Sequence, residues 1–181
     1  MFKTDFTHGC MLAVGGAKSG KSRFALDVCR GLNRKCIFIA TAQALDLEME
    51  ERIKRHQAER GGEWLTIEEP INVVDRIRSL DSEDTAILLD CLTLWLNNLY
   101  MKYGEDQETI EQAIECLIRQ LSIIRGAIVV VSNEVGMGIV PDTPLSRLYR
   151  DNMGYMNQRI AHLARKVVTV MAGLPLMLKD D

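Results

Sequence analysis

The segment Gly15-Gly16-Ala17-Lys18-Ser19-Gly20-Lys21-Ser22 decides the fold expected for this chain. It matches in full the pattern G-x-x-x-x-G-K-[S/T], the phosphate-binding P-loop. The apolar run 11–14 stands directly before it and the helical stretch 22–32 directly after it, which is the context that the pattern needs. A glycine-rich turn matching by chance would not be expected to have both flanks. The sequence therefore predicts a binding site for a nucleoside triphosphate.

Each part of the predicted P-loop has a physical role. Its glycines let successive backbone N–H groups point at phosphate oxygens, and the start of the following helix adds a positive potential. The ammonium of Lys21 would neutralise the β and γ phosphates, and the hydroxyl of Ser22 would bind Mg²⁺. P-loop enzymes also hold Mg²⁺ with a carboxylate at the end of a buried strand. Asp90 is the first candidate and Glu134 the second, although Asp90 would also suit the N-cap of the next helix.

Apolar strands and helical stretches alternate along the rest of the chain. The expected strands are 11–14, 36–40, 63–69, 86–90, 127–132 and 167–171, and the expected helices are 22–32, 46–59, 70–80, 92–102, 107–125 and 145–165. Pro70 is expected to open its helix, and 176–178 to add a hairpin arm. Unbroken apolar strands separated by helices predict a mainly parallel sheet with helices on both faces. The fold class is therefore α/β, with one P-loop nucleotide-binding domain over 1–181 and a tail at 1–9.

Composition narrows the class of protein. The net charge of -3 gives no basic field that would attract nucleic acid. The apolar run near the N-terminus is too short for a signal peptide, and no stretch is long enough to span a bilayer. The five cysteines are scattered, without metal-binding spacing, and Cys10, Cys36 and Cys91 lie in or beside apolar runs. We therefore expect a cytoplasmic protein without disulfides.

His56 differs from the other two histidines in its surroundings. Arg52, Lys54, Arg55 and Arg60 all lie within four residues of it, and their potential favours the neutral imidazole. A neutral imidazole can attack phosphorus. Taken alone, His56 is more readily interpreted as an exposed residue of a charged helix.

Four segments together give His56 a more specific role. They are 15–23, then 39–42, then the stretch from Arg52 through His56 and Arg60 to Trp64, and finally the segment NEVGMGIVP at 133–141. In this order and spacing they closely resemble the bifunctional adenosylcobinamide kinase/adenosylcobinamide-phosphate guanylyltransferases of cobalamin biosynthesis. The resemblance runs from about residue 10 to 179, and NEVGMGIVP is far more specific than the P-loop.

The resemblance implies two reactions, a RecA-like sheet and a homotrimer. A nucleoside triphosphate, ATP or GTP, phosphorylates the aminopropanol hydroxyl of adenosylcobinamide. GTP then gives GMP to an enzyme histidine, and the phosphorylated corrinoid takes the GMP to form adenosylcobinamide-GDP. The nucleophile of the family falls here on His56, and Arg55 replaces the second histidine that some relatives have there.

The resemblance also implies a set of site residues. The nucleotide contacts of the family fall here on Gly15, Gly16, Ala17, Lys18, Ser19, Gly20, Lys21, Ser22, Ala40, Thr41, Ala42, Gln57, Ala58, Glu59, Arg60, Glu68 and Asp90. His56 and Lys21 would be catalytic, and Ser22 and Asp90 would hold Mg²⁺. Neutral or acidic side chains can accept hydrogen bonds from the N1–H and 2-amino groups of guanine.

Two other functions remain open from the residues themselves. One is a P-loop kinase of small molecules in which His56 has no role. The other is a RecA-like nucleotide switch or DNA-binding module, which the acidic net charge disfavours. Arg147 and Arg150, one helical turn apart, would suit a phosphate clamp or a solvated helix face equally well.

Overall fold

The computed structural model describes residues 5–44 and 46–181, apart from the side chains of Arg52, Arg55, His56 and Glu59. Within this part of the chain, seven strands form one sheet in the order β3-β2-β4-β5-β1-β6-β7. They are β1 (Gly9–Gly15), β2 (Lys35–Ala40), β3 (Leu65–Glu68), β4 (Thr85–Asp90), β5 (Ala127–Asn133), β6 (Lys166–Met171) and β7 (Leu174–Asp180). All neighbouring strands are parallel except β6 and β7, which form an antiparallel hairpin.

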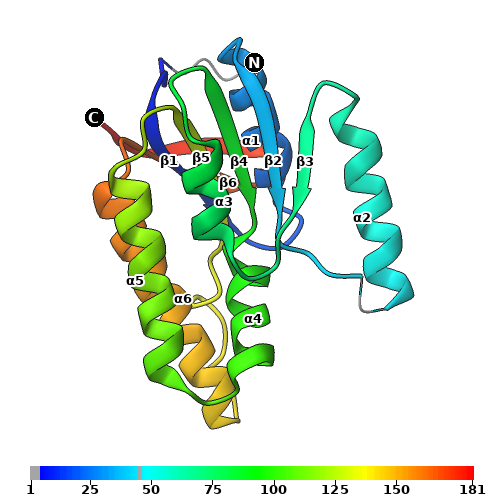
Figure 1. The fold of residues 1–181 in the computed structure, drawn as a ribbon. Coiled ribbons are helices and arrows are strands. Elements are labelled where there is room, and N and C mark those ends of the chain that lie inside the picture. Colours follow the sequence, from blue (N-terminus) through cyan, green and yellow to red (C-terminus); the bar gives the residue numbers. More distant parts are fainter. Residues whose placement is uncertain (1–4, 45) are drawn as a thin grey trace.

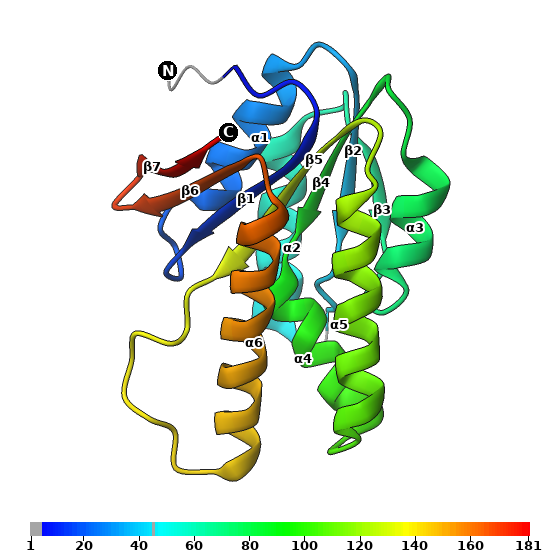
Figure 2. The ribbon, with the colours of Figure 1, turned by 90° about the vertical axis from the view of Figure 1, so that its left-hand side faces the viewer.

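Helices cover both faces of the sheet (Figures 1 and 2). They are α1 (Lys21–Gly31), α2 (Leu47–Arg60), α3 (Val73–Leu80), α4 (Leu92–Tyr103), α5 (Gln107–Ser122) and α6 (Pro144–Leu163). Helix α1 packs on one face and α3 to α6 on the other, while α2 stands beside the edge strand β3 (Figure 1). Among the described residues, none of the helices combines the length and apolar character needed to cross a bilayer.

Alternate side chains of the central strands build two apolar layers. Leu12 and Val130 join the layer under α3 to α6, whereas their neighbours Met11 and Val129 join the layer under α1. All four are almost completely buried. Because successive side chains of a strand point to opposite faces, a sheet covered on both faces needs unbroken apolar strands. This confirms the α/β fold expected from those runs.

The start of α3 differs from the expectation that Pro70 opens this helix. The buried carboxylate of Glu69 accepts hydrogen bonds from the backbone N–H groups of Ile71 and Asn72 at 3.1 and 2.7 Å, so the chain turns first. The helix begins only at Val73. Burial would raise the pKa of Glu69, but these two hydrogen bonds and the Arg76 guanidinium lower it below its ordinary value.

The segment 1–9, expected to be a tail, is part of the fold from residue 5 onward. Phe6 is 3% exposed and packs in the apolar layer under α1. Gly9 already belongs to β1 and donates a backbone hydrogen bond of 2.8 Å to Gly126. The buried ammonium of Lys166 forms ion pairs with Asp5 and Asp180. These contacts fix the segment beside the end of β7.

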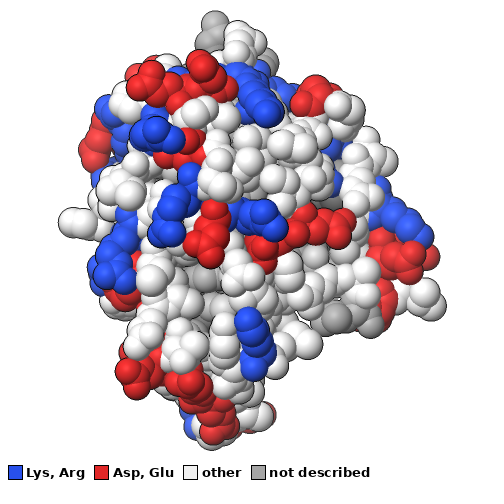
Figure 3. All heavy atoms as spheres, in the orientation of Figure 1, with Lys and Arg blue, Asp and Glu red and all other residues white. Residues whose placement is uncertain are grey.

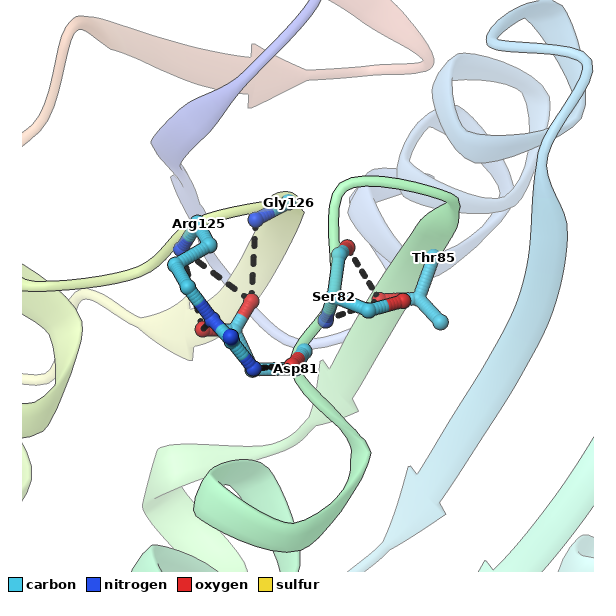
Figure 4. A network of polar contacts seen from close by, with 5 residues as sticks. All are labelled: Asp81, Ser82, Thr85, Arg125 and Gly126. Carbon is cyan, nitrogen blue, oxygen red and sulfur yellow. Dashed lines mark hydrogen bonds and ion pairs between the residues drawn. The ribbon is translucent and has the colours of Figure 1, made fainter.

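A network of hydrogen bonds holds together the amino ends of β4 and β5 (Figure 4). The buried carboxylate of Asp81 accepts hydrogen bonds from the backbone N–H groups of Arg125 and Gly126 at 2.9 Å each. Thr85 bonds both the N–H and the carbonyl of Ser82 through its hydroxyl, at 3.0 and 2.8 Å. A Cβ on Gly126 would lie 2.2 Å from the Ser82 carbonyl oxygen, so only glycine fits there. These contacts hold the start of β4 beside the start of β5, and the two paired strands then run in parallel to the opposite, carboxyl edge of the sheet.

Candidate functional site

The predicted P-loop connects β1 to α1 at the carboxyl edge of the sheet. Gly20 lies immediately before the helix with φ 97°, and Lys18 has φ 55°. Left-handed backbone of this kind lets a loop curl tightly around a ligand. The ammonium of Lys21 folds back over the loop and donates a hydrogen bond of 2.9 Å to the Gly16 carbonyl. The loop and its lysine thus form the cradle that the motif predicts.

The turn of the β6–β7 hairpin supports the P-loop from outside. The N–H of Gly173 donates a hydrogen bond of 2.9 Å to the Ser19 carbonyl. A Cβ on Gly20 would lie 3.2 Å from the Gly173 Cα, and a Cβ on Gly15 would lie 2.4 Å from the Val170 carbonyl oxygen. Close backbone packing therefore requires glycine at position 15 and restricts position 20.

A cleft of about 700 Å³, including its open mouth, lies between the P-loop, the carboxyl ends of the strands and α2. This size suits a nucleotide. The predicted site residues that line it are Lys21, Ser22, Ala40, Ala42, Gln57, Arg60, Glu68 and Asp90. Residues from the P-loop, from three strand ends and from α2, far apart in sequence, therefore meet in one cleft.

Other predicted residues lie beside this lining. The hydroxyl of Thr41 is fully buried and joins the end of β2 to Cys91, donating to its carbonyl and accepting from its N–H at 2.8 Å each. Ala58 is exposed on α2 and outside the lining. His56 and Glu59 belong to α2, but their side chains are outside the described residues. The N–H of Thr41 also donates to the Asp90 carbonyl at 3.1 Å, and its carbonyl accepts from the Asn98 amide at 2.7 Å, so Thr41 supports the wall of the cleft from behind.

Arg60 lines one wall of the cleft, and two aromatic side chains pack behind it. It is 4% exposed, and its guanidinium carbon lies 3.9 Å from the centre of the Phe38 ring. Trp64 packs edge-on against Phe38, with the ring centres 6.2 Å apart. Burial lowers the pKa of Arg60, and the negative charges of Asp90 and Glu68 oppose that shift. A guanidinium held over an aromatic ring can stack on a base or bind a phosphate.

Ser22 and Asp90, predicted to hold Mg²⁺, line the same cleft as Lys21. Asp90 is not the N-cap of α4, because Cys91 occupies that position. The second candidate, Glu134, accepts a hydrogen bond of 3.2 Å from the Gly136 N–H and lies outside the lining. The described residues contain no group of three or more histidine, cysteine, aspartate or glutamate side chains that could hold a metal. A hydroxyl with one carboxylate fits Mg²⁺, which retains several waters in protein sites.

Cys91 also lines the cleft, but its surroundings disfavour the thiolate form. Burial, assisted by the charge of Asp90, raises the pKa of its thiol to about 11. A thiol with that pKa stays protonated near neutral pH, and the thiolate is the nucleophilic form. All five cysteines are free, as expected from their scattered positions.

Several residues of the cleft have no role in the sequence analysis. They are Phe38, Met49, Ile53, Thr66, Leu94 and Asn133. Phe38 belongs to an apolar strand and was expected only as core. One face of α2 carries Met49 and Ile53 at helical spacing with the predicted site residues Gln57 and Arg60. This spacing is the signal in the sequence that could have identified Met49 and Ile53.

Arg147 and Arg150 contact their own segment. Arg147 donates hydrogen bonds to the carbonyls of Pro141 and Asp142 at 3.0 and 2.8 Å, and so fixes the loop that precedes α6. Arg150 forms an ion pair of 3.2 Å with Asp151. These contacts give both arginines a structural role.

Charges of both signs are interspersed on the face shown in Figure 3. No broad basic area covers the described residues on this face, which lacks the continuous positive stripe typical of nucleic-acid-binding surfaces.

A sequence model of the family described as "Cobinamide kinase / cobinamide phosphate guanyltransferase" matches residues 11–178. The chain belongs to this family. The cobinamide kinase/guanyltransferase relatives include the bifunctional adenosylcobalamin biosynthesis protein CobP of Pseudomonas aeruginosa, 42% identical over 170 residues, which cover 94% of this chain and 97% of CobP. The protein CobU of Escherichia coli is 37% identical over 180 residues, covering 93% of this chain and 99% of CobU. The predicted resemblance is confirmed.

Solved structures of more distant proteins share the fold of this cobinamide kinase/guanyltransferase family member. The flagellar accessory protein FlaH of Methanocaldococcus jannaschii has a TM-score of 0.53 and 14% identity, covering 97% of this chain and 80% of FlaH. The RadB recombinase has a TM-score of 0.53 and 13% identity, covering 91% of this chain and 75% of RadB. Together with the sheet order, this likeness confirms the P-loop fold of RecA-like type.

Proposed function

We propose that this chain phosphorylates adenosylcobinamide and then transfers GMP from GTP to the product through a GMP–histidine intermediate on His56. Membership of the cobinamide kinase/guanyltransferase family supports both activities. One structural observation carries the proposal. The P-loop residues Lys21 and Ser22 and the helix that contains His56 border the same cleft.

The backbone position of His56 supports its role as the nucleophile. Ile53, Gln57 and Arg60 line the cleft from α2. Position 56 lies three residues after the first and four before the last of them, which places it beside their face of the helix. A nucleophile carried by α2 would thus border the space that receives the nucleotide.

In the guanylyl step the nitrogen of His56 forms a bond to the α phosphorus while the bond from that phosphorus to pyrophosphate breaks. Lys21 and the positive end of α1 stabilise the departing pyrophosphate. Ser22 and Asp90 would hold Mg²⁺, which when bound neutralises further charge on the triphosphate. The phosphate group of the phosphorylated corrinoid then displaces the histidine and takes the GMP.

The wall around Arg60 supports the selection of guanine. Gln57 and Glu68 offer oxygens that can accept hydrogen bonds from N1–H and the 2-amino group, which adenine lacks. Arg60, held on Phe38, offers a flat cation on which a purine can stack.

In the kinase step ATP or GTP donates its γ phosphoryl group, and catalysis depends mainly on positioning and charge neutralisation. Asp90 and Glu134 are also the two candidates for accepting the hydroxyl proton, and of these Asp90 lines the cleft and Glu134 does not. Asp90 is therefore the better placed of the two.

GTP labelled at the α phosphate tests the covalent intermediate. The protein incubated with this GTP should carry label after denaturing electrophoresis, because the GMP–histidine bond survives denaturation. The bond should be labile in acid and stable in alkali, as expected for a phosphorus–nitrogen bond. A protein that never takes up label at any pH would instead be a P-loop kinase without guanylyltransferase activity, or a nucleotide switch.

We further propose that the protein forms homotrimers in the cytoplasm. The edge strand β7 supports self-association, because Leu174, Leu176 and Leu178 are 72, 60 and 59% exposed and form a row along it. Exposed apolar rows of this kind are typical of protein interfaces. The free cysteines fit a reducing compartment.

Sedimentation equilibrium tests the assembly. The wild type should have the mass of a trimer, and Leu176→Lys should shift the distribution toward monomers because it places a charge in the apolar row. Met101→Lys, a change at an exposed residue of α4, serves as the matched control and should stay trimeric. A wild type that sediments as a monomer at all concentrations contradicts the proposal.

A further inference from the structure

Asn133 lies at the junction of the two main parts of the nucleotide site. It is the last residue of β5 and pairs in register with Gly15, the first residue of the P-loop. On the other side of β5, Val131 pairs with Asp90. Asn133 therefore stands between the P-loop and the strand that ends in the proposed metal-binding carboxylate, and it lines the same cleft as both.

Hydrogen bonds on both sides fix the backbone of Asn133. Its N–H donates to the Thr93 hydroxyl at 3.0 Å, and its carbonyl accepts from the Asn157 amide at 3.1 Å. The oxygen of that same amide accepts from the Ser132 hydroxyl at 2.6 Å. This arrangement holds the position of residue 133 independently of its own side chain.

The side-chain oxygen of Asn133 has a different environment. Oδ1 is buried, and none of the described residues donates a hydrogen bond to it. Buried acceptors are nearly always paired in folded proteins, since an unpaired one costs free energy. An unpaired acceptor in the wall of a ligand cleft therefore indicates that the ligand supplies the donor.

The chemistry of the two substrates restricts what that donor can be. The oxygens of a bound triphosphate are acceptors at neutral pH and cannot donate to Oδ1. The hydroxyl that attacks the γ phosphate has a proton to donate. We propose that Asn133 accepts a hydrogen bond from this attacking hydroxyl and so orients its oxygen toward the γ phosphorus. The inference rests on the kinase part of the proposed function.

The step balances without a charge on Asn133. The hydroxyl oxygen bonds to the γ phosphorus, the bond from that phosphorus to the bridging oxygen breaks, and the nucleoside diphosphate leaves. The proton stays on the hydroxyl, hydrogen-bonded to Asn133, until the new bond to phosphorus forms. It then passes to an oxygen of the transferred phosphate group, because a neutral amide is too weak a base to take it. Asn133 contacts a reacting atom throughout, and a water molecule in place of the corrinoid hydroxyl would be oriented in the same way.

Asn133→Ala should lower kcat for phosphorylation of adenosylcobinamide by about 10- to 100-fold, the range expected for one lost hydrogen bond in the transition state. KM for the nucleotide and labelling by GTP should change little. Slow hydrolysis of the γ phosphate, measured without corrinoid, should fall by a similar factor. The thermal midpoint should stay the same or rise, because an unpaired buried acceptor is removed.

Asn152→Ala is the matched control. The Asn152 amide donates to the Tyr100 hydroxyl and to Gln107 at 2.9 and 3.1 Å, away from the cleft. Its loss should lower the thermal midpoint and leave both activities unchanged, the opposite pattern to Asn133→Ala.

The other possible results of these measurements contradict either the role of Asn133 or the proposed kinase activity. Equal nucleotide hydrolysis and equal kcat in wild type and Asn133→Ala overturn the inference. A lower thermal midpoint that accounts for the lost activity makes Asn133 a structural residue only. Loss of GTP labelling together with kinase activity would assign Oδ1 to a metal-bound water, and again overturn the inference. A wild type that hydrolyses nucleotide but phosphorylates no corrinoid contradicts the proposed kinase, while its hydrolysis still tests Asn133.

Discussion

Lys21→Ala is expected to abolish both phosphoryl and guanylyl transfer. Both reactions place the triphosphate in the same cradle, where the Lys21 ammonium lies 2.9 Å from the Gly16 carbonyl and lines the cleft. Loss of such a preorganised charge should cost roughly 3–4 kcal/mol of transition-state stabilisation, or about 10²- to 10³-fold in rate. Steady-state kinetics of both reactions measure the effect.

Lys35→Ala is the matched control for this change. Lys35 is an exposed lysine at the start of β2, on the opposite edge of the sheet. Its replacement should leave both rates unchanged. The thermal midpoint of Lys21→Ala without nucleotide should equal that of the wild type, which excludes unfolding as the cause. Near-normal turnover in Lys21→Ala would remove the P-loop from the proposed mechanism.

His56→Ala is expected to separate the two reactions. It should eliminate GMP attachment and the formation of adenosylcobinamide-GDP, because no nucleophile remains to attack the α phosphorus. Phosphorylation of adenosylcobinamide should remain measurable, since that transfer needs the P-loop and metal but no enzyme nucleophile. His56→Asn, which keeps polarity and approximate size, should behave in the same way. Labelling of the wild type should decline in acid as the imidazole protonates.

Three results would contradict this role of His56. If His56→Ala still takes up label from GTP, another residue is the nucleophile. If both reactions vanish while GTP still binds, His56 has a broader role than that of the nucleophile in guanylyl transfer. If His56→Asn retains guanylyl transfer, nucleophilicity is not what the histidine supplies.

The local sequence pattern predicted those parts of the fold in which the preferences of the residues and their burial favour the same secondary structure. The unbroken strand around Val129 and Val130 is buried on both faces, so its composition alone indicated a central parallel strand. The prediction that Pro70 opens α3 was wrong because a local contact competes with proline's preference for a first turn: the Glu69 carboxylate accepts hydrogen bonds from the N–H groups two and three residues after it. The preference of proline alone does not take into account that a neighbouring side chain can bind the same backbone N–H groups.

Site residues that belong to a sequence motif were predictable, whereas those that reach the site only through tertiary packing were not. Lys21, Ser22 and Asp90 were identified from their patterns and meet in one cleft. Phe38 has the sequence pattern of a core residue, and only the folded structure brings Arg60 over its ring. Asn133 was visible within a conspicuous segment, but the unpaired state of its oxygen is a property of the three-dimensional surroundings.

The hairpin turn at Gly173 limits how far the phosphate-binding octapeptide can be treated as a portable module. The turn holds Ser19 by a backbone hydrogen bond of 2.9 Å and lies so close to Gly20 that a side chain there would be crowded. Grafting residues 15–22 alone into another scaffold would transfer the consensus and leave behind the wall that shapes it. A working transplant would have to include β6 and the turn as well, although they lie about 150 positions later in the chain.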